Sequence, residues 1–408
     1  MSTTNPTNDP REDFSSALLN KGVVALSTGA FGSGMSMRVV DPMLVRLAED
    51  FSIPIALASW TITIFGLAYG LSQLLFGPLG DRYGKVKVIA YGCGACSIAA
   101  LSCGLTSDFH ALLAARALAG ATAASIIPLS MAWIGDVVPY ENRQAVLARF
   151  LIGQILGLST GIFVGGFSAD YLGWRFPFFM IALWFGAICI YLNLLNRSLP
   201  EHARLRHQSE GRGITHMFSE FRRVLAVSWA KQVLMTVSAE GAMVFGALAF
   251  IPAHLHTVHG LSLASAGSLV MLFGLGGLLF AARSRHWVKS YGEVGLIQRG
   301  AALMSVSLIV LGAAPWWWLA VPSCFGFGLG FYMMHNTLQI NATQMAPERR
   351  GAAVAAFASC FFLGQSLGVA ASGALFHRAG TPPLLAAAGF LVLLIGLRFA
   401  RLRARKPD

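Results

Sequence analysis

The stretch Gly77-Pro-Leu-Gly80-Asp81-Arg82-Tyr-Gly84-Lys85-Val-Lys87 joins two apolar runs, residues 55–78 and 86–106. Each run is long enough for a membrane-spanning helix, which takes about 20 apolar residues. The glycines permit a tight turn where two helices approach closely, and basic residues favour the cytoplasmic side of a membrane. The stretch therefore indicates a short polar hairpin between two membrane-spanning helices.

The composition of the whole chain supports a membrane protein. Of 408 residues, 55% are apolar and 12% are charged, which is about half the charged share of an ordinary soluble protein. A soluble domain, a disordered chain and a disulfide scaffold are excluded by these values. We predict an all-α membrane protein with twelve transmembrane helices, because evenly spaced apolar runs with tight loops favour a helical bundle over a barrel. The runs cover roughly residues 19–45, 55–78, 86–106, 110–135, 145–168, 174–196, 226–252, 263–283, 294–313, 316–341, 350–376 and 381–399.

One long polar connection, residues 197–223, lies at the midpoint of the chain and carries six arginines. It divides the twelve runs into two groups of six. The predicted organisation is listed in chain order: a cytoplasmic tail 1–18, a six-helix lobe 19–196, a cytoplasmic linker 197–225, a second six-helix lobe 226–400 and a basic tail 401–408.

The basic residues predict the orientation of the chain. With both termini on one side, 22 of the 30 Lys and Arg residues fall in segments on that side, and three (Arg46, Arg175 and Arg378) fall in loops on the other side. The positive-inside rule then places both termini in the cytoplasm. The net charge of +12 is explained in the same way, so nucleic acid is not an expected partner.

The two halves of the chain resemble each other. Glu141, Arg143 and Phe150 recur 207 residues later as Glu348, Arg350 and Phe357. Tyr83-Gly84 recurs 208 residues later, and GQILG at 153–157 recurs as GQSLG at 364–368, with an offset of 211. We therefore expect two six-helix pseudo-repeats, an arrangement in which many secondary transporters alternate access to a central site.

The hairpin quoted above resembles the signature loop of the major facilitator superfamily, G-x-L-x-D-R-x-G. The resemblance implies the major facilitator fold and a cytoplasmic gate made of an acid, a base four residues later and a second acid at the end of the fourth span. The matching residues of the gate are Gly77, Asp81, Arg82, Gly84, Lys85 and Asp136.

The fifth apolar run resembles the drug/proton antiporter branch of this family. Its glycines, Gly157, Gly161, Gly165 and Gly166, have the spacing of that branch and allow close helix contact. Ile162 stands where the branch has proline, so the resemblance leaves export and import open. It implies a multi-pass protein of the bacterial inner membrane, driven by a proton gradient and without a cofactor.

Charge within the predicted spans is costly and normally faces the bundle interior, and four such residues, Arg38, Asp41, Arg116 and Glu240, are candidates for function. Arg38 and Asp41 are three residues apart, so in a helix they share a face and can pair. We expect Asp41 to carry protons, with Arg38 and Arg116 tuning it; the alternative is a permanent ion pair that only fixes packing. Glu240 is the second candidate, either as a titrating group or as a contact for a cationic substrate.

Polar residues of other spans are candidates for a substrate cavity. His335 and Gln339 are four residues apart and share a helix face, and Asn336 lies beside them. They are expected to line the cavity with Gln154, Gln365, Met35 and Tyr69; Trp60 and Phe245 are further candidates for its apolar wall. For the glutamines, interhelical hydrogen bonds are an equally good explanation, and aromatic residues in spans often only pack.

The sequence gives little indication of metal binding, ATP hydrolysis or enzymatic catalysis. His254, His256 and His259 form H-x-H-x-x-H, but a helix places residues two apart on different faces, so a metal site is not expected. The six cysteines lie within apolar runs. No Walker loop and no hydrolase motif occurs, which argues against an ATP-driven pump and against an enzyme.

The sequence thus predicts a proton-coupled secondary transporter that exports small organic molecules by alternating access, working as a monomer in the lipid bilayer. The alternative is a proton-coupled importer of a metabolite or a metal in the same fold.

Overall fold

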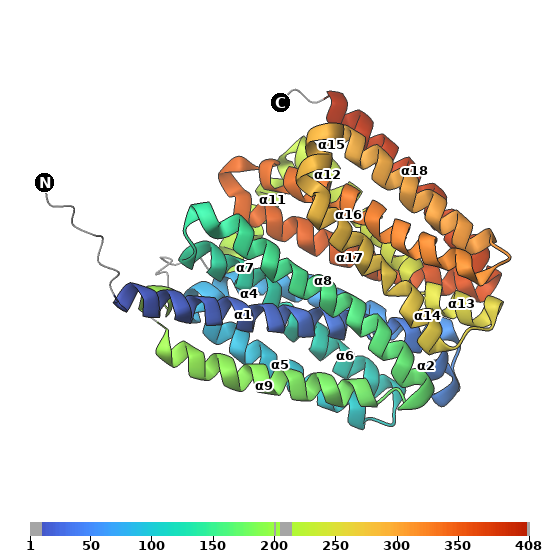
Figure 1. Cartoon of the computed structure of the whole chain (residues 1–408), viewed down its shortest axis with the longest axis horizontal. Coiled ribbons are helices and arrows are strands. Elements are labelled where there is room, and N and C mark those ends of the chain that lie inside the picture. The colour runs from blue at the N-terminus through green and yellow to red at the C-terminus, as the bar shows by residue number, and fades with distance from the viewer. Residues whose placement is uncertain (1–9, 200, 205–213, 406–408) are drawn as a thin grey trace, which may run out of the picture.

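The structure is a computed structural model that describes residues 10–199, 201–204 and 214–405, and the regular elements in these ranges are all helices (Figure 1). In the first lobe they are α1 (Pro10–Arg38), η1 (Asp41–Met43), α2 (Leu44–Asp50), α3 (Ile55–Ala58), α4 (Trp60–Tyr83), α5 (Lys85–Leu105), α6 (Phe109–Ala123), α7 (Ile126–Val137), α8 (Tyr140–Tyr171) and α9 (Phe176–Ser198).

Two helices of the linker, α10 (Glu201–Arg204) and α11 (Ile214–Ala226), lead to the second lobe. That lobe consists of α12 (Ser228–Leu248), α13 (Ile251–His259), α14 (Leu263–Val270), α15 (Leu272–Ala313), η2 (Trp317–Leu319), α16 (Ala320–Gln344), η3 (Pro347–Arg349), α17 (Arg350–Ala379) and α18 (Thr381–Arg405).

The twelve-helix prediction is confirmed. Among the described residues, 11 segments are long and apolar enough to cross a membrane, and one of them, Leu263–Ala313, has 51 residues. A single crossing takes about 20 residues, so this segment is long enough for two. Gly292 divides it, because its φ of 62° and ψ of 179° interrupt the helix and turn the chain back.

Helices reach into the predicted tails and linker. Helix α1 begins at Pro10, within the predicted tail, and α18 continues to Arg405, within the predicted basic tail. Helix α11 begins within the predicted linker and ends at Ala226, directly after it. Residues 1–9, 200, 205–213 and 406–408, which belong to the two tails and the linker, are outside the described residues.

The two lobes repeat the same internal packing. A Cβ atom on Gly157 would meet the carbonyl of Phe31, and a Cβ on Gly364 would meet the carbonyl of Ser238. Both members of the second pair lie 207 residues after those of the first. Since Gly161 with Met35 and Gly368 with Ala242 repeat the relation, helix α8 packs on α1 as α17 packs on α12.

This packing corrects one detail of the sequence repeat. The motif match between residues 153–157 and 364–368 has an offset of 211, but the structural equivalent of Gly157 is Gly364, at an offset of 207. The residues that match in sequence are therefore about one helical turn away from the positions that are equivalent in the structure. Gly84 and Gly292 have an offset of 208, one residue from that equivalence, and both glycines have positive φ, 92° and 62°.

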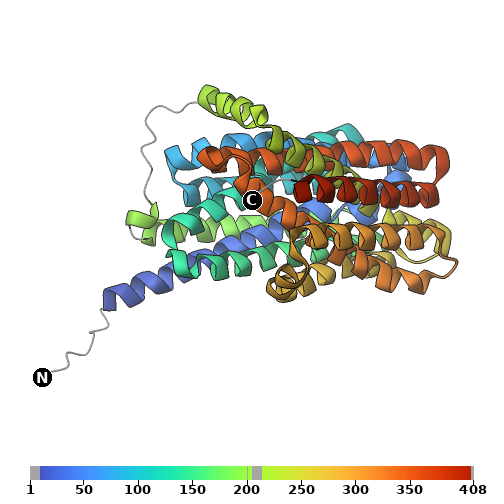
Figure 2. The ribbon, with the colours of Figure 1, turned by 90° about the horizontal axis from the view of Figure 1, so that it is seen from above.

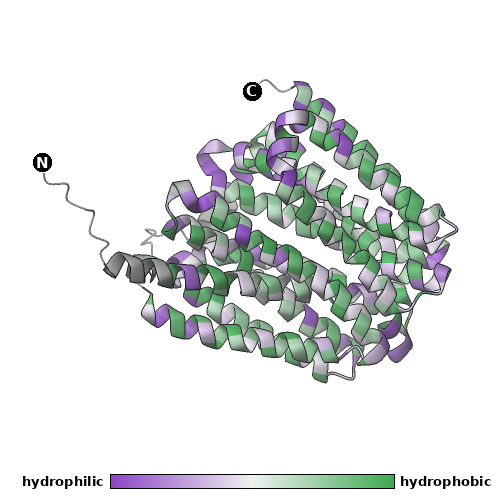
Figure 3. Ribbon diagram, viewed as in Figure 1, coloured by the Kyte–Doolittle hydropathy of each residue, from purple (hydrophilic) through white to green (hydrophobic). Residues whose placement is uncertain are grey.

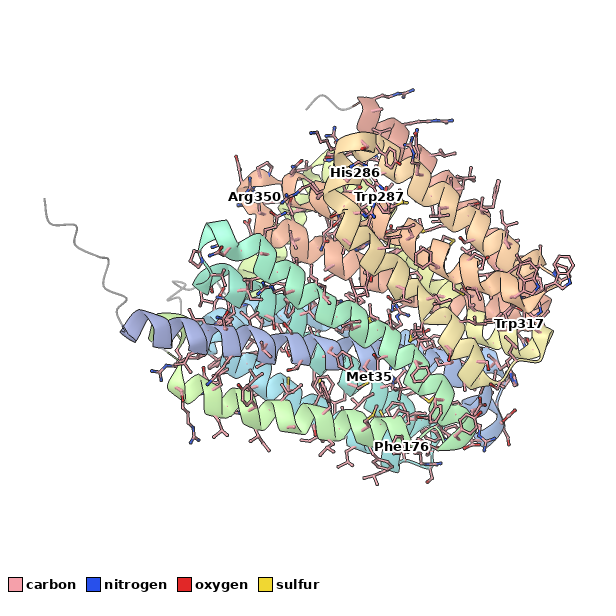
Figure 4. All side chains as sticks on the ribbon, in the orientation of Figure 1. Met35, Phe176, His286, Trp287, Trp317 and Arg350 are labelled. Atoms are coloured by element: carbon pink, nitrogen blue, oxygen red, sulfur yellow. The ribbon has the colours of Figure 1, made fainter. Side chains whose placement is uncertain are left out.

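The ends of the bundle differ in polarity. The end at which α1 begins and α18 finishes, here called the termini end, carries His286 and Arg350; Phe176 and Trp317 mark the opposite end, here called the far end (Figure 4). Figure 3 shows hydrophobic residues along the lengths of the helices and hydrophilic residues gathered at their ends. This is the pattern expected of helices that cross a bilayer.

The lobes meet mainly through α4 with α17 and through α8 with α14, and these helices lie side by side in both views (Figures 1 and 2). On α4, Gly66 and Gly70 face Ser366 and Phe362 of α17. Gly77 lies on the same face of α4, two turns nearer the termini end, and a Cβ there would meet no neighbour within 4 Å. The contact of α4 with α17 thus includes Gly66 and Gly70, whereas a side chain at Gly77 would have free space around its Cβ.

Candidate functional site

The centre of the site is the ion pair between Arg38 and Asp41. Arg38 Nη1 lies 3.3 Å from Asp41 Oδ2, and both side chains are at most 1% exposed. The predicted pairing is confirmed, but the backbone between the two residues is not a regular helix, since α1 ends at Arg38 and the 3-10 turn η1 starts at Asp41. Pro42 accounts for the break, because its ring excludes the carbonyl four residues earlier, that of Arg38.

Arg38 also connects the two lobes. Its Nη2 donates a hydrogen bond of 2.8 Å to Oε1 of Gln365 on α17, and its guanidinium lies 4.1 Å above the ring of Phe245 on α12. The ion pair of the first lobe is therefore capped by the second lobe. Asp41 Oδ1 is buried and has no hydrogen-bond partner among the described residues.

Very little space remains beside this pair. A void of about 10 Å³ is bordered by Arg38, Ile162, Phe245, Phe273 and Tyr332, among others. A void of this size holds no organic molecule. The arrangement thus shows Arg38 sealed between the lobes, with the far end closed above it.

Arg116 is anchored to backbone carbonyls. Its Nε donates to Thr61 O at 3.1 Å and its Nη1 donates to Ser36 O at 3.0 Å, while its guanidinium lies 4.3 Å from the ring centre of Phe65. No hydrogen bond joins Arg116 to Asp41 in the part of the chain that the structure describes. The position of Arg116 favours a role in tying α6 to α1 and α4.

Glu240 and His335 form a second polar pair inside the bundle, which the sequence did not reveal. Glu240 Oε2 lies 2.8 Å from His335 Nδ1, and the Glu240 side chain is fully buried. Rings of Phe331 and Phe361 lie 4.9 and 4.6 Å from the His335 ring. Glu240 Oε1 has no partner among the described residues, so this carboxylate too has a free acceptor inside the bundle.

The predicted cavity residues separate into two groups. Gln154, His335, Asn336 and Gln339 are partly exposed, whereas Gln365 is buried against Arg38. Met35 and Tyr69 are 2% and 1% exposed, so neither lines an open cavity in this arrangement.

Packing against neighbouring helices explains why Met35 and Tyr69 are buried. The Met35 backbone is in close contact with Gly161 of α8, and the Tyr69 ring lies 4.3 Å from Phe362 of the other lobe. Of the other predicted apolar wall residues, Phe245 contacts Arg38, whereas Trp60 is 44% exposed.

The predicted gate has its expected ion pairs. Lys85 Nζ lies 3.0 Å from Asp81 Oδ1 and 2.8 Å from Asp136 Oδ2. Gly84 ends α4 with a φ of 92°, which brings Lys85 back towards Asp81. Arg82 lies over the ring of Tyr83 at 5.2 Å. All of these contacts lie within the first lobe.

The four predicted packing glycines make two kinds of contact. A Cβ on Gly157 or Gly161 would meet the backbone of α1, and a Cβ on Gly165 would meet Val39, directly after α1, so these residues allow α8 to lie directly on α1 and its continuation. Gly166 faces Leu263 and Gly267 of α14 instead. The fourth glycine thus serves contact between the lobes.

Two histidines of the H-x-H-x-x-H motif have structural partners. His254 Nδ1 lies 2.6 Å from Thr381 Oγ1 and its Nε2 lies 2.8 Å from Leu311 O, and His256 Nδ1 lies 2.7 Å from Leu261 O. Within residues 10–199, 201–204 and 214–405, no cluster of His, Cys, Asp and Glu could hold a metal ion.

The fold and the gate define a secondary-transporter architecture, and comparison with known proteins assigns the family. The sequence profile of the Major Facilitator Superfamily matches residues 26–368. The chain belongs to this superfamily.

Individual relatives are more distant. The chain is 26% identical over 359 residues to the uncharacterized MFS-type transporter YwfA of Bacillus subtilis, covering 88% of this chain and 86% of that protein. It is 29% identical over 157 residues to the multidrug export protein EmrB of Escherichia coli, covering 38% of this chain and 31% of that protein. The crystal structure of a mutant of the peptide transporter POT superposes with a TM-score of 0.75 at 17% identity, over 94% of each chain. That likeness concerns the fold.

Proposed function

We propose that this protein is a proton-coupled transporter that exports small organic molecules, with Asp41 as the residue that binds and releases the proton. The observation that carries the proposal is the position of Asp41. Its side chain is fully buried, one oxygen is held by Arg38 and the other has no partner among the described residues. A carboxylate in such a place is costly unless it is paired, so a change in its pairing changes its affinity for a proton.

Alternating access supplies that change of pairing. Arg38 is bonded both to Asp41 in its own lobe and to Gln365 in the other. Opening the far end requires α4 and α17 to part, which breaks the bond to Gln365 and admits water to Asp41. Asp41 then exchanges a proton at the far end, and closure of the lobes isolates it again.

The Glu240–His335 pair is the second titratable group in this mechanism. It lies on α12 and α16, in the lobe opposite Asp41. His335 is partly exposed while Glu240 is buried, so His335 is the partner through which substrate or water reaches the pair. Gln339, one turn nearer the termini end, extends this polar face.

Export is supported by two features. The glycine spacing of α8 resembles that of drug/proton antiporters, and part of the chain is similar to the multidrug export protein EmrB. The alternative is import of a metabolite or a metal with protons. The peptide transporter POT, which has a similar fold, is consistent with this alternative. The excess of basic residues at the termini end favours a cytoplasmic position for both termini in a bacterial inner membrane.

The direction of coupling is tested with purified protein in liposomes that contain a pH-sensitive dye, against a panel of amphipathic cations, anions and neutral compounds. For an antiporter, an acidic interior drives substrate uptake and the interior becomes more alkaline. For a symporter, an acidic exterior drives uptake and the interior becomes more acidic. The sign does not depend on the orientation of the protein, because the proton gradient drives either orientation. Substrate movement that is indifferent to both gradients would contradict the proposal.

A further inference from the structure

A groove on the side of the first lobe has no part in the mechanism above. It has a volume of about 490 Å³ and is bordered by residues of α1, α8 and α9, among them Asn20, Val24, Phe31, Arg149 and Trp184. Helix α1 packs against both α8 and α9 and lies between them at the front of the molecule in Figure 1. The groove thus follows α1 between α8 and α9.

This face of the lobe is directed at the bilayer. Val24 is 63% exposed, and Leu183 and Leu194 of α9 are 77% and 57% exposed. Exposed apolar side chains of this size on a transmembrane helix belong to its lipid-facing side. The lining of the groove is itself mostly apolar, and its charged member is Arg149.

Arg149 lies at the depth of the lipid headgroups. Helix α8 ends at Tyr171, and the rings of Phe163, Phe167 and Tyr171 pack on one another along its last turns, as expected near a membrane interface. The hydrocarbon core of about 30 Å corresponds to about 20 helical residues. The other interface therefore falls near residue 151, next to Arg149.

The deep end of the groove lies within the hydrocarbon core. The Trp184 ring lies 5.2 Å from Phe31, and the Phe31 carbonyl is level with Gly157 on α8. Gly157 lies six residues beyond the interface near residue 151, which is about 9 Å along the helix and more than half the depth of one leaflet of the core. The groove is thus apolar within this leaflet and cationic at its mouth.

We propose that this groove binds one anionic phospholipid of the leaflet at the termini end, with the headgroup phosphate at Arg149 and an acyl chain along α1 towards Trp184. Arg149 has no ion-pair partner in the ranges that the structure describes, so its charge is available to the phosphate. Gly153, one turn further along α8, brings that helix against the Ser27 carbonyl and forms the floor of the groove.

The proposal is tested by native mass spectrometry of the delipidated full-length protein, titrated with phosphatidylglycerol or phosphatidylcholine of identical chains. We expect one phosphatidylglycerol to bind more tightly than the others and more tightly than phosphatidylcholine. Arg149→Gln should weaken this binding about five-fold, the usual contribution of one basic residue at a membrane surface. Arg149→Lys should restore it.

Two further variants separate the groove from general surface charge. Val24→Phe places a larger side chain at an exposed position of the groove and should displace the lipid without unfolding the protein. Arg299→Gln removes another exposed arginine, which lies over the Tyr291 ring on α15, and should leave the tight binding unchanged. Equal binding of the two lipids, or equal loss in Arg149→Gln and Arg299→Gln, would overturn the proposal.

Discussion

Arg38 Nη2 donates a 2.8 Å hydrogen bond to Gln365 Oε1, which joins two residues 327 positions apart in the chain and in different lobes. The same guanidinium holds Asp41 at 3.3 Å. The Arg38 side chain therefore contacts both the carboxylate of Asp41 and the opposite lobe, so protonation of Asp41 and contact between the lobes affect the same group. This is the physical link that proton-driven alternating access requires, because binding at one site must change the relative stability of two conformations.

Replacing Gln365 by Leu should weaken the closed far end. The change leaves a buried donor of Arg38 without an acceptor, which costs about 1–3 kcal/mol and shifts the equilibrium towards separation of the lobes there. Spin labels at residues 57 and 375, on exposed positions of α3 and α17, should show longer distances. Gln154→Leu is the matched control, because Gln154 is only half-buried. Unchanged distances in Gln365→Leu would show that the bond does not hold the lobes together.

Replacing Gly157 or Gly364 by Ala should destabilise the protein by similar amounts. Each added Cβ would collide with a backbone carbonyl, that of Phe31 or of Ser238, and such overpacking costs about 1–3 kcal/mol. Thermal unfolding in detergent measures the effect. Gly77→Ala, which meets no neighbour within 4 Å, should leave the melting temperature nearly unchanged. A smaller loss for Gly157→Ala than for Gly77→Ala would refute the repeated helix packing.

Replacing Lys85 by Gln should impair transport more than stability. Asp81 and Asp136 are 40% and 43% exposed, so the pairs contribute no more than about 1 kcal/mol to folding. Transport should fall several-fold, since two carboxylates then face each other at the gate, and Lys85→Arg should recover it. Arg46→Gln also removes two ion pairs of one basic residue, which lie at the far end and are more exposed, and serves as the control. Transport at the wild-type rate in Lys85→Gln would show that the ion pairs of Lys85 are not needed for transport.

Replacing Glu240 by Gln should change the pH dependence of transport. The amide still bonds to His335 but no longer ionises, so one ionisation should disappear from the profile of rate against pH. Glu240→Leu should in addition lower the thermal stability, because His335 Nδ1 then loses its 2.8 Å partner. Identical pH profiles for the wild type and Glu240→Gln would make the pair structural only.

Local features of the sequence predicted local features of the structure well. The Arg38–Asp41 pair, the ion pair of Lys85 with Asp81, and the close contacts of Gly157 and Gly161 depend on residues within one motif or on a helical period. The ion pair of Lys85 with Asp136 joins two different helices and was predicted by the family resemblance alone. The sequence also contained the repeat, but matching letters cannot distinguish one helical turn from the next, and the match of residues 153–157 with 364–368 lies one turn away from the structural equivalence of Gly157 and Gly364.

Contacts between distant helices could not be predicted in this way. The partners Glu240 and His335 are 95 residues apart, and Arg38 and Gln365 are 327 apart. Both pairs depend on which faces of four separate helices meet. The break after Arg38 was missed because an apolar run shows no interruption of its backbone, although Pro42 is its physical cause.

The most direct test of the central claim compares two activities of Asp41→Asn in liposomes. One is substrate exchange without a gradient, and the other is substrate accumulation driven by a proton gradient. Because only the second needs a titrating group, the variant should retain exchange while its proton-driven accumulation falls by at least about ten-fold, the change expected when an essential proton-transfer group is lost. Proton-driven accumulation at the wild-type level in Asp41→Asn would contradict the account.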